Sequence, residues 1–150
     1  MLKTVFPTID RESSMLGFGC MRFPCTADGK IDEAEAIRMV RHAIDSGVTY
    51  IDTAYFYHGG DSERLVAKAL KDGYREKVFL ATKSPVWLYE SEDDFDRLLD
   101  EQLTKLQTDH IDFYLLHAIQ HNNIDKYDNY GIWEFVKQQK EKGLIRNMGF

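Results

Sequence analysis

The segment YIDTAYFYHGGDSE, residues 50–63, begins as an apolar strand and ends in a polar loop. Its isoleucine is followed at once by Asp52, then by three aromatic residues and His58, and then by Gly59 and Gly60. Glycines allow the backbone to turn sharply, so we expect this loop to fold back beside the strand end. A strand that brings an acid and aromatic side chains to one place indicates the edge of a functional site.

Further apolar runs indicate that this strand belongs to a larger sheet. The runs cover residues 15–21, 48–53, 78–82, 111–116 and 145–150. Continuous apolar runs are typical of strands that are buried on both faces, as in a parallel sheet. Their starts lie roughly 30 residues apart, which is the spacing that successive βα units require.

Between the strands, apolar residues recur at helical spacing. The predicted helices run from Asp32 to Gly47, from Ser62 toward Gly73, from Ser91 through Leu106, and from around Ile132 to Gly143. Asp32 with Glu35 three residues later resembles a capping box, and Asp94 stands in the same relation to Ser91. The alternation of strands and helices predicts a parallel sheet covered by helices.

Two architectures fit this alternation, an open doubly wound sheet and a (β/α)8 barrel. A doubly wound nucleotide-binding domain usually has a glycine-rich phosphate loop after its first strand. Residues 17–22, GFGCMR, hold the first two glycines of such a loop but lack the third. The sequence therefore favours an α/β fold of the TIM-barrel type. Because a complete barrel needs ~250 residues, we expect residues 1–150 to form one incomplete barrel domain with the first four βα units and strand five.

The composition excludes several classes of partner. A formal net charge of -6 and a pI near 5.3, with no block of Lys or Arg, disfavour nucleic acid and anionic lipid. The N-terminus lacks an apolar signal region and no stretch is long enough to span a bilayer, so we expect a cytoplasmic protein. Cys20 and Cys25 fit neither a redox pair nor a metal framework, and we expect both to be free, buried thiols.

Ionisable residues end three successive predicted strands. Asp52, Lys83 and His117 each stand where an apolar run stops. Taken singly, each has an ordinary explanation: a loop cap, a solvated strand end and a satisfied core histidine. In a parallel barrel, however, the carboxyl ends of the strands open onto one face. The three groups together therefore indicate an active site.

Tyr57, in the loop beyond Asp52, completes this candidate site. A tyrosine is a weak acid unless a nearby cation favours its phenolate, and Lys83 is positioned to supply that cation. An ion pair with Asp52 would hold the ammonium, while His117 would orient an oxygen. Such a set suits protonation of a carbonyl oxygen while a nicotinamide delivers hydride to the carbon. A metal site is only weakly indicated, by the i, i+4 pair of His117 and His121.

The sequence resembles the aldo-keto reductase superfamily over essentially all of its 150 residues. Residues 51–57, IDTAYFY, leading to Ser62 and Glu63, look like the family's aspartate–tyrosine signature. Residues 80–83, LATK, look like its lysine strand, and residues 108–117, TDHIDFYLLH, like its histidine strand. The resemblance implies a reductase of aldehyde or ketone carbonyls that uses NADPH, or alternatively NADH.

The resemblance also implies roles for individual residues. The implied catalytic tetrad is Asp52, Tyr57, Lys83 and His117, with Tyr57 as general acid. The implied cofactor contacts are Gly19, Cys20 and Met21 at the nicotinamide and Asp52 at the ribose, with no metal. Residues 58–61, HGGD, depart from relatives in which a single glycine follows the tyrosine.

Residues 29–32 and 72–78 are similar to a bacterial branch of the family in which some members add an iron-sulfur domain. Two cysteines are too few to hold such a cluster here. We expect the isolated chain to reduce carbonyls weakly or not at all, and to self-associate through the open edge of the barrel or to be poorly soluble. The alternative is a non-catalytic binding or regulatory module, like the potassium-channel β-subunit relatives, or an inactive fragment that retains the fold.

Overall fold

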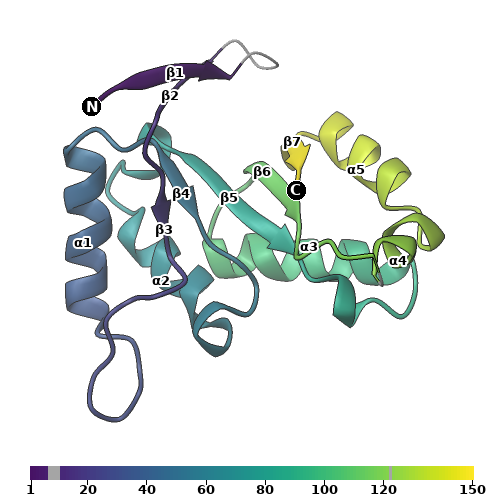
Figure 1. Cartoon of the computed structure of the whole chain (residues 1–150), viewed down its shortest axis with the longest axis horizontal. Helices are drawn as coiled ribbons and strands as arrows, with labels where there is room; N and C mark the ends of the chain where they lie inside the picture. The colour runs from purple at the N-terminus through teal and green to yellow at the C-terminus, as the bar shows by residue number, and fades with distance from the viewer. Residues whose placement is uncertain (7–10, 122) are drawn as a thin grey trace.

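A computed structural model of the chain describes residues 1–6, 11–121 and 123–150. Its centre is a five-stranded parallel sheet in which the strands are neighbours in the order in which they occur along the chain (Figure 1). The strands are β3 (Phe18–Gly19), β4 (Tyr50–Asp52), β5 (Phe79–Ser84), β6 (Ile111–Leu116) and β7 (Ile145–Gly149). A doubly wound sheet reverses its strand order, whereas a barrel does not. The predicted barrel-type α/β fold is therefore confirmed, as a partial barrel.

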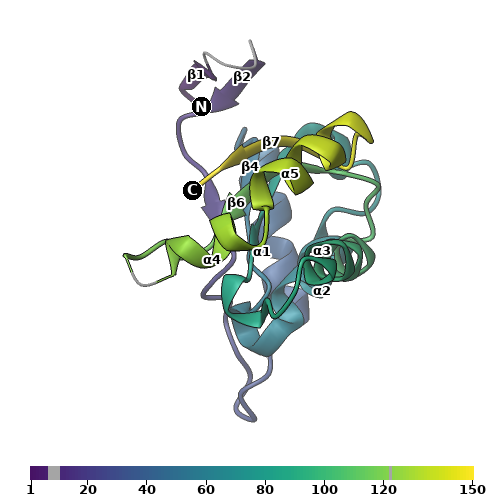
Figure 2. The same ribbon diagram turned by 90° about the vertical axis from the view of Figure 1, so that its right-hand side faces the viewer.

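The helices connect successive strands and lie on one side of the sheet, where α2 and α3 run beside each other (Figure 2). They are α1 (Glu33–Asp45), α2 (Asp61–Ala69), α3 (Asp93–Leu106), α4 (Ile124–Asn129) and α5 (Ile132–Glu141). None of the helices in the described part of the chain is long and apolar enough to cross a membrane.

The N-terminal starts of α1 and α3 can be compared with the two predicted caps. The carboxylate of Asp32 accepts a hydrogen bond from the backbone N–H of Glu35 at 3.1 Å, which confirms the predicted start of α1. The start predicted at Ser91 is wrong, because α3 begins at Asp93. The Asp94 carboxylate instead accepts the backbone N–H groups of Glu90 and Ser91, at 2.9 and 3.0 Å, and so holds the loop before the helix.

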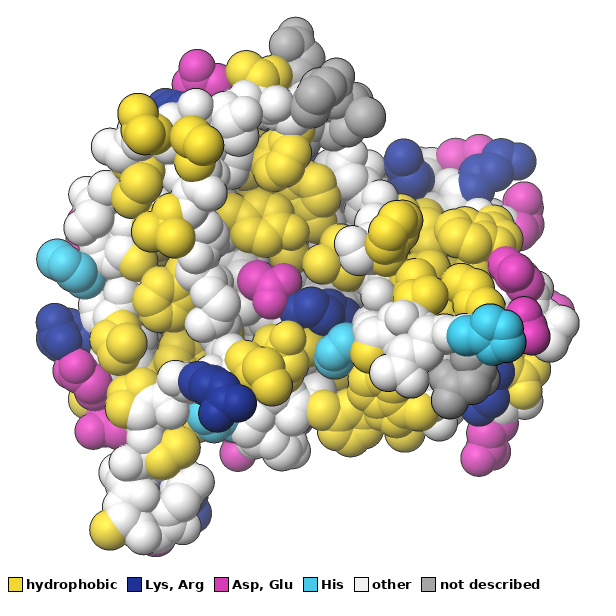
Figure 3. All heavy atoms as spheres, viewed as in Figure 1, with side chains coloured by type: hydrophobic (Ala, Val, Ile, Leu, Met, Phe, Trp, Pro, Cys, Tyr) yellow, Lys and Arg dark blue, Asp and Glu magenta, His cyan; other side chains and the backbone are white. Residues whose placement is uncertain are grey.

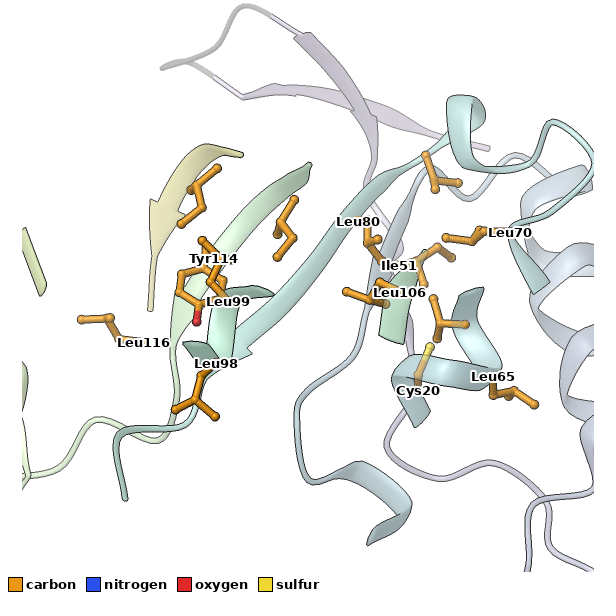
Figure 4. Packing of buried hydrophobic residues seen from close by; sticks show 14 of the residues in the cluster. Cys20, Ile51, Leu65, Leu70, Leu80, Leu98, Leu99, Leu106, Tyr114 and Leu116 are labelled. Carbon is orange, nitrogen blue, oxygen red and sulfur yellow. The ribbon is translucent and has the colours of Figure 1, made fainter. Parts of the chain in front are cut away.

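The hydrophobic core lies between the sheet and the helices. Ile51, Leu80 and Tyr114 project from β4, β5 and β6 into this layer, where they are fully buried (Figure 4). Strand residues alternate between the two faces of a sheet. Tyr50 and Asp52, on either side of Ile51, accordingly lie on the opposite face and are only partly buried. This second face carries the side chains of the candidate site.

A β-hairpin, which the sequence pattern did not predict, packs against the N-terminal end of the sheet. It pairs β1 (Lys3–Phe6) with β2 (Arg11–Ser14) in antiparallel register (Figure 1). The ring of Phe6 lies 6.3, 5.9 and 5.1 Å from the rings of Tyr50, Phe79 and Phe113. These rings form an aromatic cluster near the N-terminal ends of β4, β5 and β6.

Candidate active site

The ends of β4 and β5 bring a carboxylate and an ammonium into direct contact. Lys83 Nζ lies 2.6 Å from Asp52 Oδ1 and donates a second hydrogen bond to the carbonyl oxygen of Thr53 at 2.8 Å. The neighbours of Lys83 in the strand, Thr82 and Ser84, are fully buried. Strand alternation therefore directs Lys83 to the opposite face, towards Asp52.

Tyr57 reaches the same place by a sharp turn. The turn spans Tyr57–Gly60, and His58, Gly59 and Gly60 have φ angles of 53°, 65° and 102°. This left-handed backbone is what the two glycines permit, so the turn expected from the sequence is confirmed. It places the ring of Tyr57 with its centroid 4.8 Å from Lys83 Nζ. The ammonium is therefore close enough to stabilise negative charge on the phenol.

His117 follows β6 and faces Tyr57. The two rings meet edge to face with their centroids 6.1 Å apart, and the backbone N–H of His117 donates to Tyr127 Oη at 3.0 Å. Nδ1 of His117 is buried and has no hydrogen-bond partner among the described residues. Burial and the neighbouring Lys83 ammonium lower the pKa of His117 below its ordinary value of 6.5. The imidazole is therefore neutral at pH 7 and carries one N–H group.

The four predicted tetrad residues thus lie close together. Figure 3 views this face and shows an acidic, a basic and a histidine side chain next to one another near its centre, flanked by hydrophobic side chains. Together they supply a phenol that can donate a proton, a cation beside it, a carboxylate that pairs with the cation, and a neutral imidazole. This arrangement can protonate an oxygen and stabilise the charge that the proton leaves behind.

The predicted cofactor residues lie at the end of β3, beside Asp52. Gly19 pairs with Asp52 in the sheet, the space where a Gly19 side chain would lie is open, and Met21 is 54% exposed. These features fit a flat ring lying over the strand end. Cys20 differs, because its side chain is fully buried, its N–H donates to Asp52 O and its carbonyl accepts from Ser62. Its polar backbone groups are therefore already occupied by contacts within the protein.

The second cysteine does not match the expectation of a buried thiol. Cys25 is exposed, and its Sγ lies 3.9 Å from His58 Nδ1. Within the described ranges, no group of three or more His, Cys, Asp or Glu side chains is arranged to hold a metal ion.

Two further aromatic side chains extend the site: Trp87 lies beside His117, and Phe56 lies beside Trp87. Trp87 is 42% exposed, with its ring 4.9 Å from His117 and 5.4 Å from Phe56. From the sequence alone, Trp87 fits either a pocket wall or core packing, with packing preferred, and its exposure contradicts the packing interpretation. Its place just beyond the end of β5 was the available signal, because loops at that end of a barrel surround the active site.

Comparison with known proteins identifies the family to which the chain is similar. A model of the Aldo/keto reductase family matches residues 15–150. Aldo-keto reductase YhdN of Bacillus subtilis (strain 168) is 40% identical over 114 residues, covering 71% of this chain and 34% of that protein.

Solved structures of aldo-keto reductases also match the chain. The holo form of aldo-keto reductase AKR11C1 from Bacillus halodurans matches with a TM-score of 0.80 and 35% identity, over 99% of this chain and 49% of that one. An aldo-keto reductase from Klebsiella pneumoniae in complex with NADPH matches with a TM-score of 0.75 and 27% identity, over the same shares. The chain spans between a third and a half of the length of these relatives. Because the family model covers nearly all of it, the chain belongs to the aldo-keto reductase family.

Proposed function

We propose that the protein is an NAD(P)H-dependent oxidoreductase that reduces aldehyde or ketone carbonyls to alcohols. The observation that carries this proposal is the contact between Lys83 and Asp52, 2.6 Å, with the ring of Tyr57 4.8 Å from the same ammonium. NADPH is the proposed cofactor, with NADH as the alternative. The Klebsiella pneumoniae relative was solved with NADPH, which supports this choice.

In this proposal Tyr57 is the general acid. A bound nicotinamide supplies the hydride to the carbonyl carbon. As negative charge develops on the carbonyl oxygen, the Tyr57 hydroxyl transfers its proton to that oxygen. The Lys83 ammonium, beside the ring of Tyr57, stabilises the phenolate that remains. The proton lost in each turnover is recovered from solvent through the open face of the site.

Asp52 and His117 orient the reacting groups. The Asp52 carboxylate holds the ammonium in place, and its position beside Gly19 suits a contact with the cofactor ribose. The neutral imidazole of His117 positions the carbonyl oxygen by hydrogen bonding, because one of its two nitrogens carries a proton. Trp87 and Phe56 would exclude water from one side of the substrate.

Cofactor binding is tested by titrating NADPH against tryptophan fluorescence. We expect quenching that persists in Trp133→Phe, because Trp133 lies on α5. Quenching should largely disappear in Trp87→Phe, because Trp87 contacts His117 at the site. Absence of quenching in the unmodified protein, together with absence of turnover, would contradict the proposed function.

The proton donor is tested by oxidation of NADPH with an aromatic aldehyde. We expect Tyr57→Phe to lower the turnover rate by about 100- to 10,000-fold, the usual contribution of a positioned general acid. Tyr55→Phe is the matched control, because the Tyr55 hydroxyl donates to Glu101 and takes no part in the site. Equal rates in the Tyr57 variant and the unmodified protein would remove Tyr57 from the proposed role.

A further inference from the structure

A buried polar cluster lies directly behind Lys83, on the helix side of the sheet. Its central members, Glu63 of α2, Thr82 of β5 and Gln102 of α3, are fully buried. Thr82 Oγ1 donates to Glu63 Oε1 at 2.7 Å, and Gln102 Nε2 donates to the same oxygen at 2.8 Å. Gln102 Nε2 also lies 3.1 Å from Thr82 Oγ1. The cluster therefore links two helices to one strand.

Gln102 connects this cluster to the reacting groups. Its Nε2 donates to the backbone carbonyl of Lys83 at 3.1 Å, and its Oε1 accepts from Tyr114 Oη at 3.0 Å. Gln102 thus binds the backbone at the end of β5 from the helix side of the sheet, while the Lys83 side chain extends to Asp52 on the opposite side. A shift of that backbone carbonyl would move the ammonium directly.

The preceding residue of α2 holds two more strand ends. Ser62 Oγ lies 2.9 Å from Thr53 Oγ1 and donates to the carbonyl oxygen of Cys20 at 3.0 Å. Cys20 follows β3, and Thr53 follows β4. Together with Glu63, this first turn of α2 therefore contacts the ends of β3, β4 and β5, and it begins directly after the turn that carries Tyr57.

If the cluster served only to stabilise the fold, apolar side chains in its place would cost less free energy of desolvation. Glu63 Oε2 has no hydrogen-bond partner among the described residues, and Lys105 Nζ lies 3.9 Å from it. Burial raises the pKa of Glu63 above its ordinary value. Well-packed apolar residues often replace buried ionic groups without loss of stability, because desolvation offsets the electrostatic attraction. Hydrogen bonds, in contrast, fix direction as well as distance, which apolar packing does not.

We propose that Gln102, Glu63 and Ser62 are positioning residues that fix the ends of β3, β4 and β5 so that Lys83 meets Asp52 and Tyr57. The inference rests on the proposed function, which it extends from the tetrad to its support. None of these residues belongs to the tetrad, and they act on it through backbone carbonyls and through the side chains of Thr53 and Thr82.

The test compares two buried glutamines. Gln102→Leu removes the contact to the Lys83 carbonyl, whereas the control Gln139→Leu removes a bond from a buried glutamine of α5 to Asp96 of α3. The main readout is the NMR titration of His117, assigned by its absence in His117→Asn, and it needs neither substrate nor cofactor. Burial and, next, the Lys83 ammonium lower the pKa of His117, while the Asp52 carboxylate raises it. Displacement of Lys83 should therefore move the His117 midpoint upward.

We expect an upward shift of the His117 midpoint in Gln102→Leu and none in Gln139→Leu. Where turnover is measurable, kcat should fall at least about tenfold in Gln102→Leu with little change in KM, since displacement of about 1 Å can cost far more. An unchanged His117 titration in folded Gln102→Leu, or the same shift in both variants, would overturn the proposal. Both outcomes are independent of whether the protein binds NADPH, so they are distinct from failure of the proposed function.

A second pair of variants decides the question where Gln102→Leu does not fold. Thr82→Val keeps the shape of the side chain but removes its hydrogen bonds to Glu63 and Gln102, whereas Thr82→Ser retains the hydroxyl. We expect Thr82→Val to shift the His117 midpoint upward and Thr82→Ser to restore it. The same titration curve in both variants would overturn the proposal.

Discussion

The two ends of the parallel sheet use carboxylates differently. At the N-terminal end, Asp112 is 2% exposed and accepts hydrogen bonds from Arg75 Nη2 at 2.8 Å, Leu80 N at 2.9 Å and Arg146 Nη1 at 3.1 Å. These donors belong to the segment before β5, to β5 and to β7. Asp112 therefore joins several elements, and both of its oxygens are bonded.

At the C-terminal end, the side chain of Asp52 is 28% exposed and, within the described residues, pairs only with Lys83. His117 beside it keeps a buried nitrogen without a partner. Groups with unused hydrogen-bonding capacity contribute less to folding, but they remain able to bind a ligand. The contrast separates a carboxylate that stabilises the fold from one that is available for chemistry.

The largest expected effect is the loss of stability when the Asp112 carboxylate is removed from the N-terminal end of the sheet. Asp112→Ala leaves the guanidinium of Arg75, which is 16% exposed, without its partner. Loss of one member of a buried pair costs about 3–5 kcal/mol, and the free energy of unfolding in urea should fall by that amount. NADPH affinity of the folded fraction should stay unchanged. A loss below about 1 kcal/mol would contradict the structural role of Asp112.

A smaller loss of stability should follow from removal of the aromatic contact between hairpin and sheet. Phe6→Ala deletes a ring that lies within 6.3 Å of Tyr50, Phe79 and Phe113. We expect the free energy of unfolding to fall by about 2 kcal/mol, because Phe6 is only partly buried and full core deletions cost about 3–5 kcal/mol. Phe6→Leu should recover part of the loss. A neutral Phe6→Ala would show that the hairpin contributes nothing to this end of the sheet.

Removal of one member of the ion pair at the C-terminal end should lower stability less than Asp112→Ala does at the N-terminal end. Lys83→Met keeps most of the side-chain volume but removes the partly exposed pair with Asp52. We expect a change of about 1 kcal/mol or less in the free energy of unfolding. Carbonyl reduction should nevertheless be lost, because the phenolate of Tyr57 loses its cation. A stability loss as large as that of Asp112→Ala would erase the proposed contrast between the ends.

The smallest expected effect concerns the pH dependence of stability at Glu63. Burial raises the pKa of Glu63 in the folded state above the ordinary value of 4.5. As the pH rises from 4.5 towards the folded pKa, the unfolded carboxyl loses its proton first, so Glu63 makes the free energy of unfolding fall. Urea unfolding of Glu63→Gln across this range should show that this decrease is absent. A decrease identical to that of the unmodified protein would show that Glu63 does not titrate as proposed.

The sequence was more informative about the C-terminal end of the sheet than about the N-terminal end. In the described part of the chain, every parallel strand and four of the five α-helices were predicted, because hydrophobic periodicity and the glycines that end elements are local signals. Asp52, Lys83 and His117 could be grouped because parallel strands end on one face. Gly59 and Gly60 also indicated the turn that brings Tyr57 beside them. The contact of Gln102 with the Lys83 carbonyl, in contrast, joins segments far apart in the sequence, and no local pattern contains it.

The hairpin and α4 could not be predicted in this way. The strand Lys3–Phe6 is mostly exposed, and its packing depends on the contact of Phe6 with rings from three distant strands. The exposure of Trp87 was not predicted either, because the sequence pattern of an aromatic residue after a strand does not distinguish packing from a site wall. Such features depend on contacts between segments far apart in the sequence.

The placement of the hairpin has a practical consequence for handling the protein. Met1 precedes β1 and is 56% exposed, near the end of the sheet that lies away from Asp52 and Lys83 (Figure 1). An affinity tag or a surface tether attached there would leave the opening around Tyr57 directed towards the solution. Immobilisation through the amino terminus is therefore the orientation of choice for sensor measurements of small molecules.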